Sequence, residues 1–228
     1  MANANLIDVT DFTTYAPDVD LSMFGSSASQ TTTLSGIISM ASQQIVDYCA
    51  VDGFDFQLVT NEIDRAALSP MGELMINFRR RPVVTGNVQK IQLVKGGFQT
   101  TLNLTDTNNI PLYQIPYSGK FLRFPSSYLA SAGTLILGGS TQLVTMRGAD
   151  VFSQVTYLGG YTQIPMDLKL ACILWCRSIM AWQYNNQGAN NFTQGSYSVG
   201  FGSDGDDRFI KQAKKLLNNG AYLRSSIF

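Results

Sequence analysis

Hydrophobic residues recur at helical spacing near the start of the chain. From Thr33 to Ala50 they fall on one stripe, which predicts a helix that covers a core with a single face. The stripe consists of Leu34, Ile37, Ile38, Ala41, Ile45, Tyr48 and Cys49. The earlier segment LIDVTDFTTY predicts a shorter helix with Asp8 as its N-cap. The residues between these helices, from Pro17 to Thr33, predict a polar Ser/Thr loop.

A second helical pattern begins at Pro165, which suits a first helical turn, and Asp167 in that turn complements the helix dipole. The segment is apolar on nearly every side, which predicts a buried helix. One stripe contains Leu168, Ala171, Cys172, Trp175, Ile179 and Trp182, and a second contains Leu170, Ile173, Leu174 and Ala181. Either the monomer covers this helix completely, or other copies of the chain cover part of it.

We favour cover by other copies, and the second stripe supplies the candidate subunit-interface residues. They are Leu170, Ile173, Leu174, Arg177 and Ala181.

The remaining C-terminal sequence predicts a loop, a helix and a tail. Residues 187–203 are polar and glycine-rich, which predicts a long flexible loop. A helix then begins near Asp204–Asp207 and ends before Gly220 as the C′ residue. Its predicted inward residues are Phe209, Ile210, Ala213, Leu216 and Leu217. The tail 221–228 ends in apolar residues that a free monomer gains nothing by exposing.

The pattern between Gln57 and Tyr157 differs from both ends. Short runs rich in β-branched and aromatic residues alternate with Gly, Pro, Asn and Asp, which predicts antiparallel strands and hairpins. The runs are ELMINF, NVQKIQLV, FQTTLNL, KFLRF, GTLIL, QLVTMR and FSQVTYL, and KGGF at 95–98 is the best hairpin turn. No long helical pattern alternates with them, so a parallel α/β sheet is not expected.

The predicted fold class is therefore α+β. The N- and C-terminal helices form a small helical bundle, and a β-rich antiparallel insertion separates them in the sequence. We assign residues 1–56 to the N-terminal helical part, 57–157 to the β-rich insertion, and 158–228 to the C-terminal helices. The last part includes the flexible loop 187–203 and the tail 221–228.

Composition narrows the function. Sixteen basic and sixteen acidic residues balance, which argues against a protein that mainly grips nucleic acid through phosphate contacts. The chain has no histidine, so a Ser-His-Asp or Cys-His site cannot form within it. The acidic residues show no informative pairing for acid–base chemistry. We therefore predict a non-enzyme, with no catalytic residues and no cofactor.

Cys49, Cys172 and Cys176 do not form a disulfide-rich or zinc-binding pattern. We interpret them as small buried hydrophobes in a reducing compartment, and expect no metal. The N-terminus lacks the features of a signal peptide, and the longest apolar run, Leu170–Cys176, is too short to cross a bilayer. We expect no membrane association.

Three short motifs have possible binding roles. Gly200, Gly202 and Gly205 spell G-x-G-x-x-G, but no buried strand or βαβ pattern precedes them, so a loop is favoured over a nucleotide site. Three aspartates, at 204, 206 and 207, lack the closing glutamate of a calcium loop and are interpreted as helix caps. Arg79, Arg80 and Arg81 are candidates for ion pairs at a strand end or a subunit interface, or for a minor DNA-backbone contact. Strand alternation would place Arg79 and Arg81 on one face and Arg80 on the other.

At the level of its motifs the sequence resembles the head–tail connector, or adaptor, proteins of tailed bacteriophages. Three stretches carry the resemblance, in the family's order. They are LIDVTDFTTY with the later ASQQIVDYC, then ELMINFRRRPVVTGNVQKIQL, and then VTYLGGYTQIPMDLKLACILWCRSIMAWQY. The region 99–149 and the loop 187–203 are longer than the family's pattern.

The resemblance implies a structural virion protein that forms a ring, commonly of twelve subunits, beneath the portal. Such a ring extends the DNA channel without sequence-specific binding, and offers a platform to the tail or a head-closure neck protein. It implies assembly in the host cytoplasm and a final location in the virion neck. It also implies that the tail contacts the portal or a neighbouring subunit, through Tyr222, Leu223, Arg224, Ile227 and Phe228.

Two alternatives stay open. A head-closure or tail-completion neck protein shares the same biology, although such proteins tend to be more purely β. More remotely, the β-rich middle could form a nucleotide- or sugar-binding protein, in which ligand addition would raise the melting temperature of a monomer.

Overall fold

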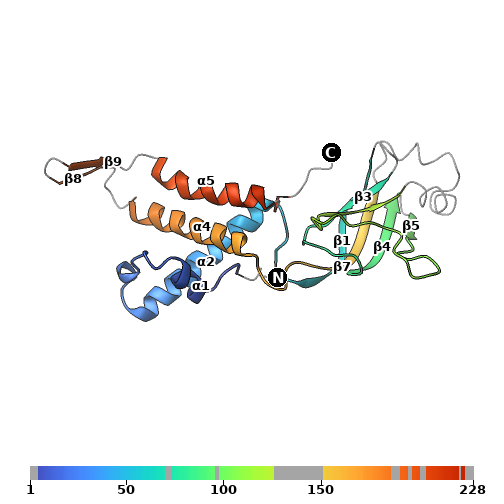
Figure 1. Cartoon of the computed structure of the whole chain (residues 1–228), viewed down its shortest axis with the longest axis horizontal. Coiled ribbons are helices and arrows are strands. Elements are labelled where there is room, and N and C mark those ends of the chain that lie inside the picture. The colour runs from blue at the N-terminus through green and yellow to red at the C-terminus, as the bar shows by residue number, and fades with distance from the viewer. Residues whose placement is uncertain are drawn as a thin grey trace. The chain divides into compact units, whose positions relative to one another are not determined.

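The computed structural model describes residues 5–69, 73–95, 98–125, 151–185, 191–194, 197–200, 204–220 and 222–223. These residues divide into two units. The chain up to Ala50 and the segment Gln163–Leu223 form a helical unit, and Val51–Thr162 form a β-rich unit. Helices at both ends of the chain and antiparallel strands between them confirm the predicted α+β class (Figure 1).

The helical unit is built around α4, which packs against both α5 and α2 and lies between them (Figure 1). Its elements are α1 (Val9–Tyr15), the 3-10 helix η1 (Ser22–Phe24), α2 (Ser27–Cys49), α4 (Met166–Asn185) and α5 (Asp204–Asn219). The Asp8 carboxylate accepts a hydrogen bond from the Asp11 N–H, which confirms the predicted cap of α1. None of the helices in the described ranges combines the length and apolar character that spanning a bilayer requires.

The predicted loop from Pro17 to Thr33 is wrong, because α2 already begins at Ser27. Ser26 caps this helix, and the hydroxyls of Thr31 and Thr32 donate to backbone carbonyls one turn earlier. Ser and Thr favour loops because they bond to nearby backbone, but the same bonds are compatible with a helix. The first two turns are largely exposed, so no apolar stripe marks them in the sequence.

The predicted flexible loop 187–203 also needs correction. Within it, β8 (Asn191–Gln194) and β9 (Tyr197–Gly200) pair as an antiparallel hairpin. Both strands are short and polar, so their composition matches that of a loop.

The described residues of the β-rich unit form two antiparallel sheets. The larger has the order β1-β7-β4-β5, from Gln57–Arg65, Phe152–Gly159, Val88–Lys95 and Phe98–Thr101. The smaller has the order β2-β3-β6, from Ala67–Leu68, Leu74–Asn77 and Phe121–Phe124. Lys95 pairs with Phe98, which confirms the β4–β5 hairpin. The predicted strands GTLIL and QLVTMR lie outside the described residues.

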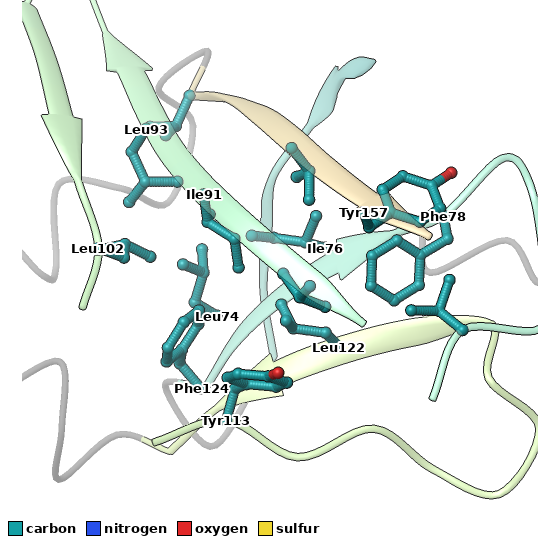
Figure 2. Packing of buried hydrophobic residues seen from close by; sticks show 14 residues of the cluster. Leu74, Ile76, Phe78, Ile91, Leu93, Leu102, Tyr113, Leu122, Phe124 and Tyr157 are labelled. Atoms are coloured by element: carbon teal, nitrogen blue, oxygen red, sulfur yellow. The ribbon is translucent and has the colours of Figure 1, made fainter. Parts of the chain in front are cut away.

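Alternate residues of both sheets form the core of this unit (Figure 2). On β7, Ser153, Val155 and Tyr157 point inward while their neighbours are less buried. The Tyr157 and Phe78 rings lie 4.7 Å apart between centroids. The buried cluster consists of Leu74, Ile76, Phe78, Val83, Val88, Ile91, Leu93, Leu102, Tyr113, Leu122, Phe124, Val151, Val155 and Tyr157.

Strand β1 is absent from the predicted runs, and its geometry explains why. Its pairing with β7 shifts register between Val59 and Glu62, and Asn61 has a φ of 55°. Such a bulge adds one residue and breaks the alternation of inward and outward side chains. As a result the inward residue after Val59 is Glu62, a charged residue where the pattern calls for an apolar one.

Candidate assembly surface

Helix α4 is buried over most of its circumference, and one stripe is less covered. Leu170 is 37% exposed, and Leu174, Arg177 and Ala181 are partly buried. These residues follow one another at intervals of four, three and four, so they lie on one helix face. The stripe presents apolar side chains at an accessible helix surface, which is a property of protein-contact sites. Four of the five candidate interface residues lie on it.

Ile173, the fifth candidate, is not on this stripe. It is only 3% exposed within the single chain. In the helix it lies on the side of Cys176 and Met180, three and seven residues later, and both are buried. Ile173 therefore belongs to the interior of the helical unit.

On the opposite side of α4, the Trp175 side chain packs against α2 and is only 6% exposed. Its indole N–H donates to Gln44 Oε1 at 2.6 Å, and its ring lies 5.9 Å from the Tyr48 ring between centroids. Tyr48 in turn donates to Asn218 Oδ1 at 3.3 Å, and the Lys214 ammonium lies over its ring. Trp175 and Tyr48 thereby join α4, α2 and α5, which holds the orientation of the exposed stripe.

Two ion pairs attach the α1 region to α4. Lys169 Nζ lies 2.8 Å from Asp11 Oδ2, and Arg177 pairs with Asp18 in the connection after α1. The hydrogen bond to Asp11 raises the pKa of Lys169, and the hydrogen bond from Arg177 lowers the pKa of Asp18. Arg177 is the charged residue of the exposed stripe, and its guanidinium already has an ion-pair partner, Asp18, within this chain.

A pocket of about 550 Å³ lies beside α1 and the start of α4. Its lining includes Leu6, Ile7, Asp11, Ile38, Ile164 and Lys169. Asp11 and Lys169 on its wall are paired with each other. Among the described residues, none of the candidate interface, tail or arginine positions lines this pocket.

The three cysteines are buried and form no disulfide with one another, and their burial agrees with their interpretation as small hydrophobes. Cys172 Sγ lies 3.7 Å from the Ser42 hydroxyl. A hydrogen bond with Cys172, together with burial, raises the pKa of the Cys176 thiol, so this thiol stays protonated. Within the described ranges no group of three or more Cys, Asp or Glu side chains is arranged to hold a metal ion.

The arginine segment lies in the β-rich unit, where β3 ends at Asn77. Because the strand ends there, the expected alternation of Arg79 to Arg81 is wrong: Arg80 and Arg81 are both buried, and Arg79 is partly buried. The Arg80 guanidinium pairs with Asp55 and also donates to the backbone carbonyls of Asp55 and Asp52. These bonds place Arg80 inside the unit, so it is not presented to a partner.

A buried polar network that the sequence pattern did not indicate lies next to this arginine. Tyr157 donates to Glu62 Oε2 at 2.6 Å and accepts from the Arg80 N–H at 3.0 Å, and the Arg79 N–H donates to Glu62 Oε1 at 3.0 Å. Burial raises the pKa of Glu62, opposed by these two donors, and burial beside Glu62 raises the pKa of Tyr157. The network joins β1, β7 and the segment after β3.

Replacing Tyr157 by Phe should test this network while keeping the ring against Phe78. We expect a loss of about 1–3 kcal/mol in the free energy of unfolding, because the Arg80 N–H and the Glu62 carboxylate each lose a partner. Tyr157 lowers the pKa of Glu62, so its removal raises that pKa further. The loss should therefore be smallest where Glu62 is protonated in both folded proteins, and should grow as the pH rises through the folded pKa of Glu62, which burial raises above its usual value.

Calorimetric unfolding of both proteins across that pH range measures this difference. Tyr117→Phe provides the control, since Tyr117 is a fully exposed tyrosine of the same unit. A loss for Tyr157→Phe that does not change with pH would show that Tyr157 does not affect the ionisation of Glu62 in this range.

The beginning of the C-terminal tail is attached to the helical unit. Tyr222 is 6% exposed, and its hydroxyl donates to Asp167 Oδ1 at 2.6 Å. In the free chain the Tyr222 side chain anchors the tail to the start of α4, and the expectation that this residue contacts a portal or a neighbour stays a prediction. Leu223 is partly buried, and residues 224, 227 and 228 lie outside the described residues.

The glycine motif does not follow a core strand. Gly200 is the last residue of β9, whose partner is β8 in a hairpin of two strands, and Gly205 is in the first turn of α5. This context differs from the strand–turn–helix of a dinucleotide site. The three aspartates lie in the first turn of α5, where negative charge favours the helix dipole.

No family model matches the chain, and no curated protein matches it. Among solved structures, the chain is similar to a chain of a structure described as the neck of an empty GTA particle computed with C6 symmetry. The sequence identity is 12% and the TM-score is 0.43, with 98% of this chain and 92% of that chain covered. Neither value is high enough to carry a conclusion about this protein.

Proposed function

We propose that this chain is a structural neck protein of a tailed virion, a head–tail adaptor without catalytic activity. It forms a ring, of twelve subunits by analogy with the resembled family, between the portal and the tail or a head-closure neck protein. The ring extends the channel through which genomic DNA passes without sequence-specific binding. Assembly takes place in the host cytoplasm.

The exposed stripe of α4 is the observation that carries this proposal. A helix whose other sides are buried retains Leu170 and Leu174 at an accessible surface, with Ala181 further along the same face. Covering this stripe by a neighbouring copy would remove apolar surface from water, at roughly 25 cal/mol per Å² buried. A ring supplies such a neighbour to every subunit.

The placement of the three resembling stretches supports the same function. The first supplies α1 and the C-terminal part of α2, and the third supplies the end of β7 and α4 up to Tyr184. These two stretches supply part of the helical unit, including the stripe. The second stretch supplies β3, the buried arginine segment and β4 of the β-rich unit.

Electron microscopy of the purified chain, alone and mixed with the portal of the same virus, tests the proposal. We expect a ring that caps the portal in the mixture, whether or not the free chain forms rings. A chain that stays monomeric and does not bind the portal would contradict the adaptor role. Binding only to an assembled neck below the portal would instead indicate a head-closure or tail-completion protein.

A further inference from the structure

Charge is segregated within the helical unit. The first 64 residues contain no lysine or arginine, and the segment from Asp8 to Asp20 carries four aspartates. By contrast, α5 carries four basic residues within eight positions: Arg208, Lys211, Lys214 and Lys215. The whole chain has no net charge, so the separation of acidic from basic residues comes from their positions along the sequence.

The basic residues of α5 form a defined surface. Arg208, Lys211 and Lys215 are exposed and lie at spacings of three and four, so they share one helix face. Ala213 and Leu217 are buried on the opposite side of the helix. We call the exposed face, made of Arg208, Lys211 and Lys215, the basic face of α5.

The acidic segment lies on another side of the unit. Helix α5 packs against α4, whereas α1 packs against α2 and is joined to α4 by the Lys169–Asp11 pair (Figure 1). Asp8, Asp18 and Asp20 are exposed in this segment. Asp18 is paired with Arg177 and Asp11 with Lys169, whereas Asp8 and Asp20 accept backbone N–H groups, so the net negative charge of the segment lies on Asp8 and Asp20. The Ser22 hydrogen bonds lower the pKa of Asp20.

We propose that the basic face of α5 docks on the acidic segment 8–20 of a second copy of this chain. This inference rests on the proposed ring and names a contact within it. A ring closes through heterologous contacts, in which two different surfaces of the subunit meet, and two oppositely charged surfaces on one unit meet that requirement. Complementary charge also fixes the direction of such a contact and disfavours the reverse one.

A second copy fits the basic face better than a nucleic acid does. The complementary acidic surface is supplied by the chain itself. Nucleic-acid binding is thus an alternative that the experiment distinguishes.

Charge reversal on each surface tests the contact. One variant carries Lys211→Glu and Lys215→Glu, and the other carries Thr14→Lys and Asp20→Lys, all at exposed positions. Each variant alone should assemble at least roughly tenfold more weakly than the wild type, because like charges then meet. Mixed in equal amounts, the two should assemble again, since each reversed surface finds its complement on the other variant.

Sedimentation velocity and electron microscopy, with the portal present if the wild type requires it, measure the assembly. Lys90→Glu with Arg65→Glu, at exposed positions of the β-rich unit, is the matched control and should assemble as the wild type does. Melting temperatures confirm that each variant is folded. If Asp20→Lys unfolds the segment, Asp20→Asn with Thr14→Lys replaces it.

The possible outcomes separate the two proposals. A wild type that never assembles overturns the ring and this contact with it. If the wild type forms rings and both variants assemble as well as it does, the contact alone is overturned. The contact is also overturned if both variants assemble more weakly and mixing them does not restore assembly. Loss of DNA binding by the α5 variant with normal rings would assign the basic face to nucleic acid and would also overturn the contact.

Discussion

Replacing Trp175 with aspartate is expected to unfold the helical unit. The indole is 6% exposed and joins α4 to α2 through Gln44 and Tyr48. Removing the large aromatic side chain costs about 3–5 kcal/mol in the free energy of unfolding. The aspartate also buries a carboxylate that has no positively charged partner, which costs more. The sum approaches the whole free energy of unfolding of a small unit, about 5–15 kcal/mol.

Hydrogen exchange followed by mass spectrometry measures this effect helix by helix. We expect amide protection to be lost in α2, α4 and α5. Leu170→Asp is the matched control, since it places the same charge five residues earlier on α4 at an exposed position, and it should keep the protection. Full protection in Trp175→Asp would show that the indole is not part of the packed interior.

The helical half of the fold was predictable because its side chains obey the helical period. The stripe from Leu34 to Cys49 and the start of α4 near Pro165 both follow from apolar spacing. The first two turns of α2 were not predictable on that basis, since residues 27–33 face no core and their Ser and Thr residues favour loops. Periodicity detects burial, so it misses helical turns that project from the packed unit.

In the β-rich unit, prediction failed where a bulge or a polar group occupies an inward position. The bulge before Glu62 hid β1, and the interior of the unit holds Glu62, Arg80 and Arg81 as well as apolar residues. Their burial depends on partners far apart in sequence, such as Tyr157 for Glu62 and Asp55 for Arg80. A prediction from local sequence patterns considers only neighbouring residues, so it cannot detect pairs of residues that are distant in the sequence.

The candidate surface was predictable in position but not in detail. Four of the five residues assigned to the interface lie on the less covered stripe of α4, because the second apolar stripe of the sequence largely coincides with it. Ile173 is apolar and lies at the edge of the stripe, and only the packing of the unit places it inside. Tyr222 likewise required the structure, since its bond to Asp167 spans 55 residues.

Replacing Leu174 with aspartate is expected to leave a folded chain that does not join a ring. Leu174 is partly buried and lies on the stripe between Leu170 and Arg177, so a carboxylate at this position keeps access to water in the free chain. In the ring the same carboxylate would be covered by the next subunit. Each contact then loses the burial of a leucine, about 1.5–3 kcal/mol, and gains a charge that must lose its water.

The loss recurs at every contact of a closed ring, so we expect no rings on the portal at concentrations where the wild type forms them. Electron microscopy of the mixture measures the rings, and circular dichroism with hydrogen exchange checks that the monomer is folded. Met40→Asp, an exposed apolar position on α2, is the control and should still form rings if α4 supplies the contact. If Leu174→Asp unfolds, the side chain belongs to the interior of the unit, and if it is folded and forms rings as the wild type does, subunits meet through another face.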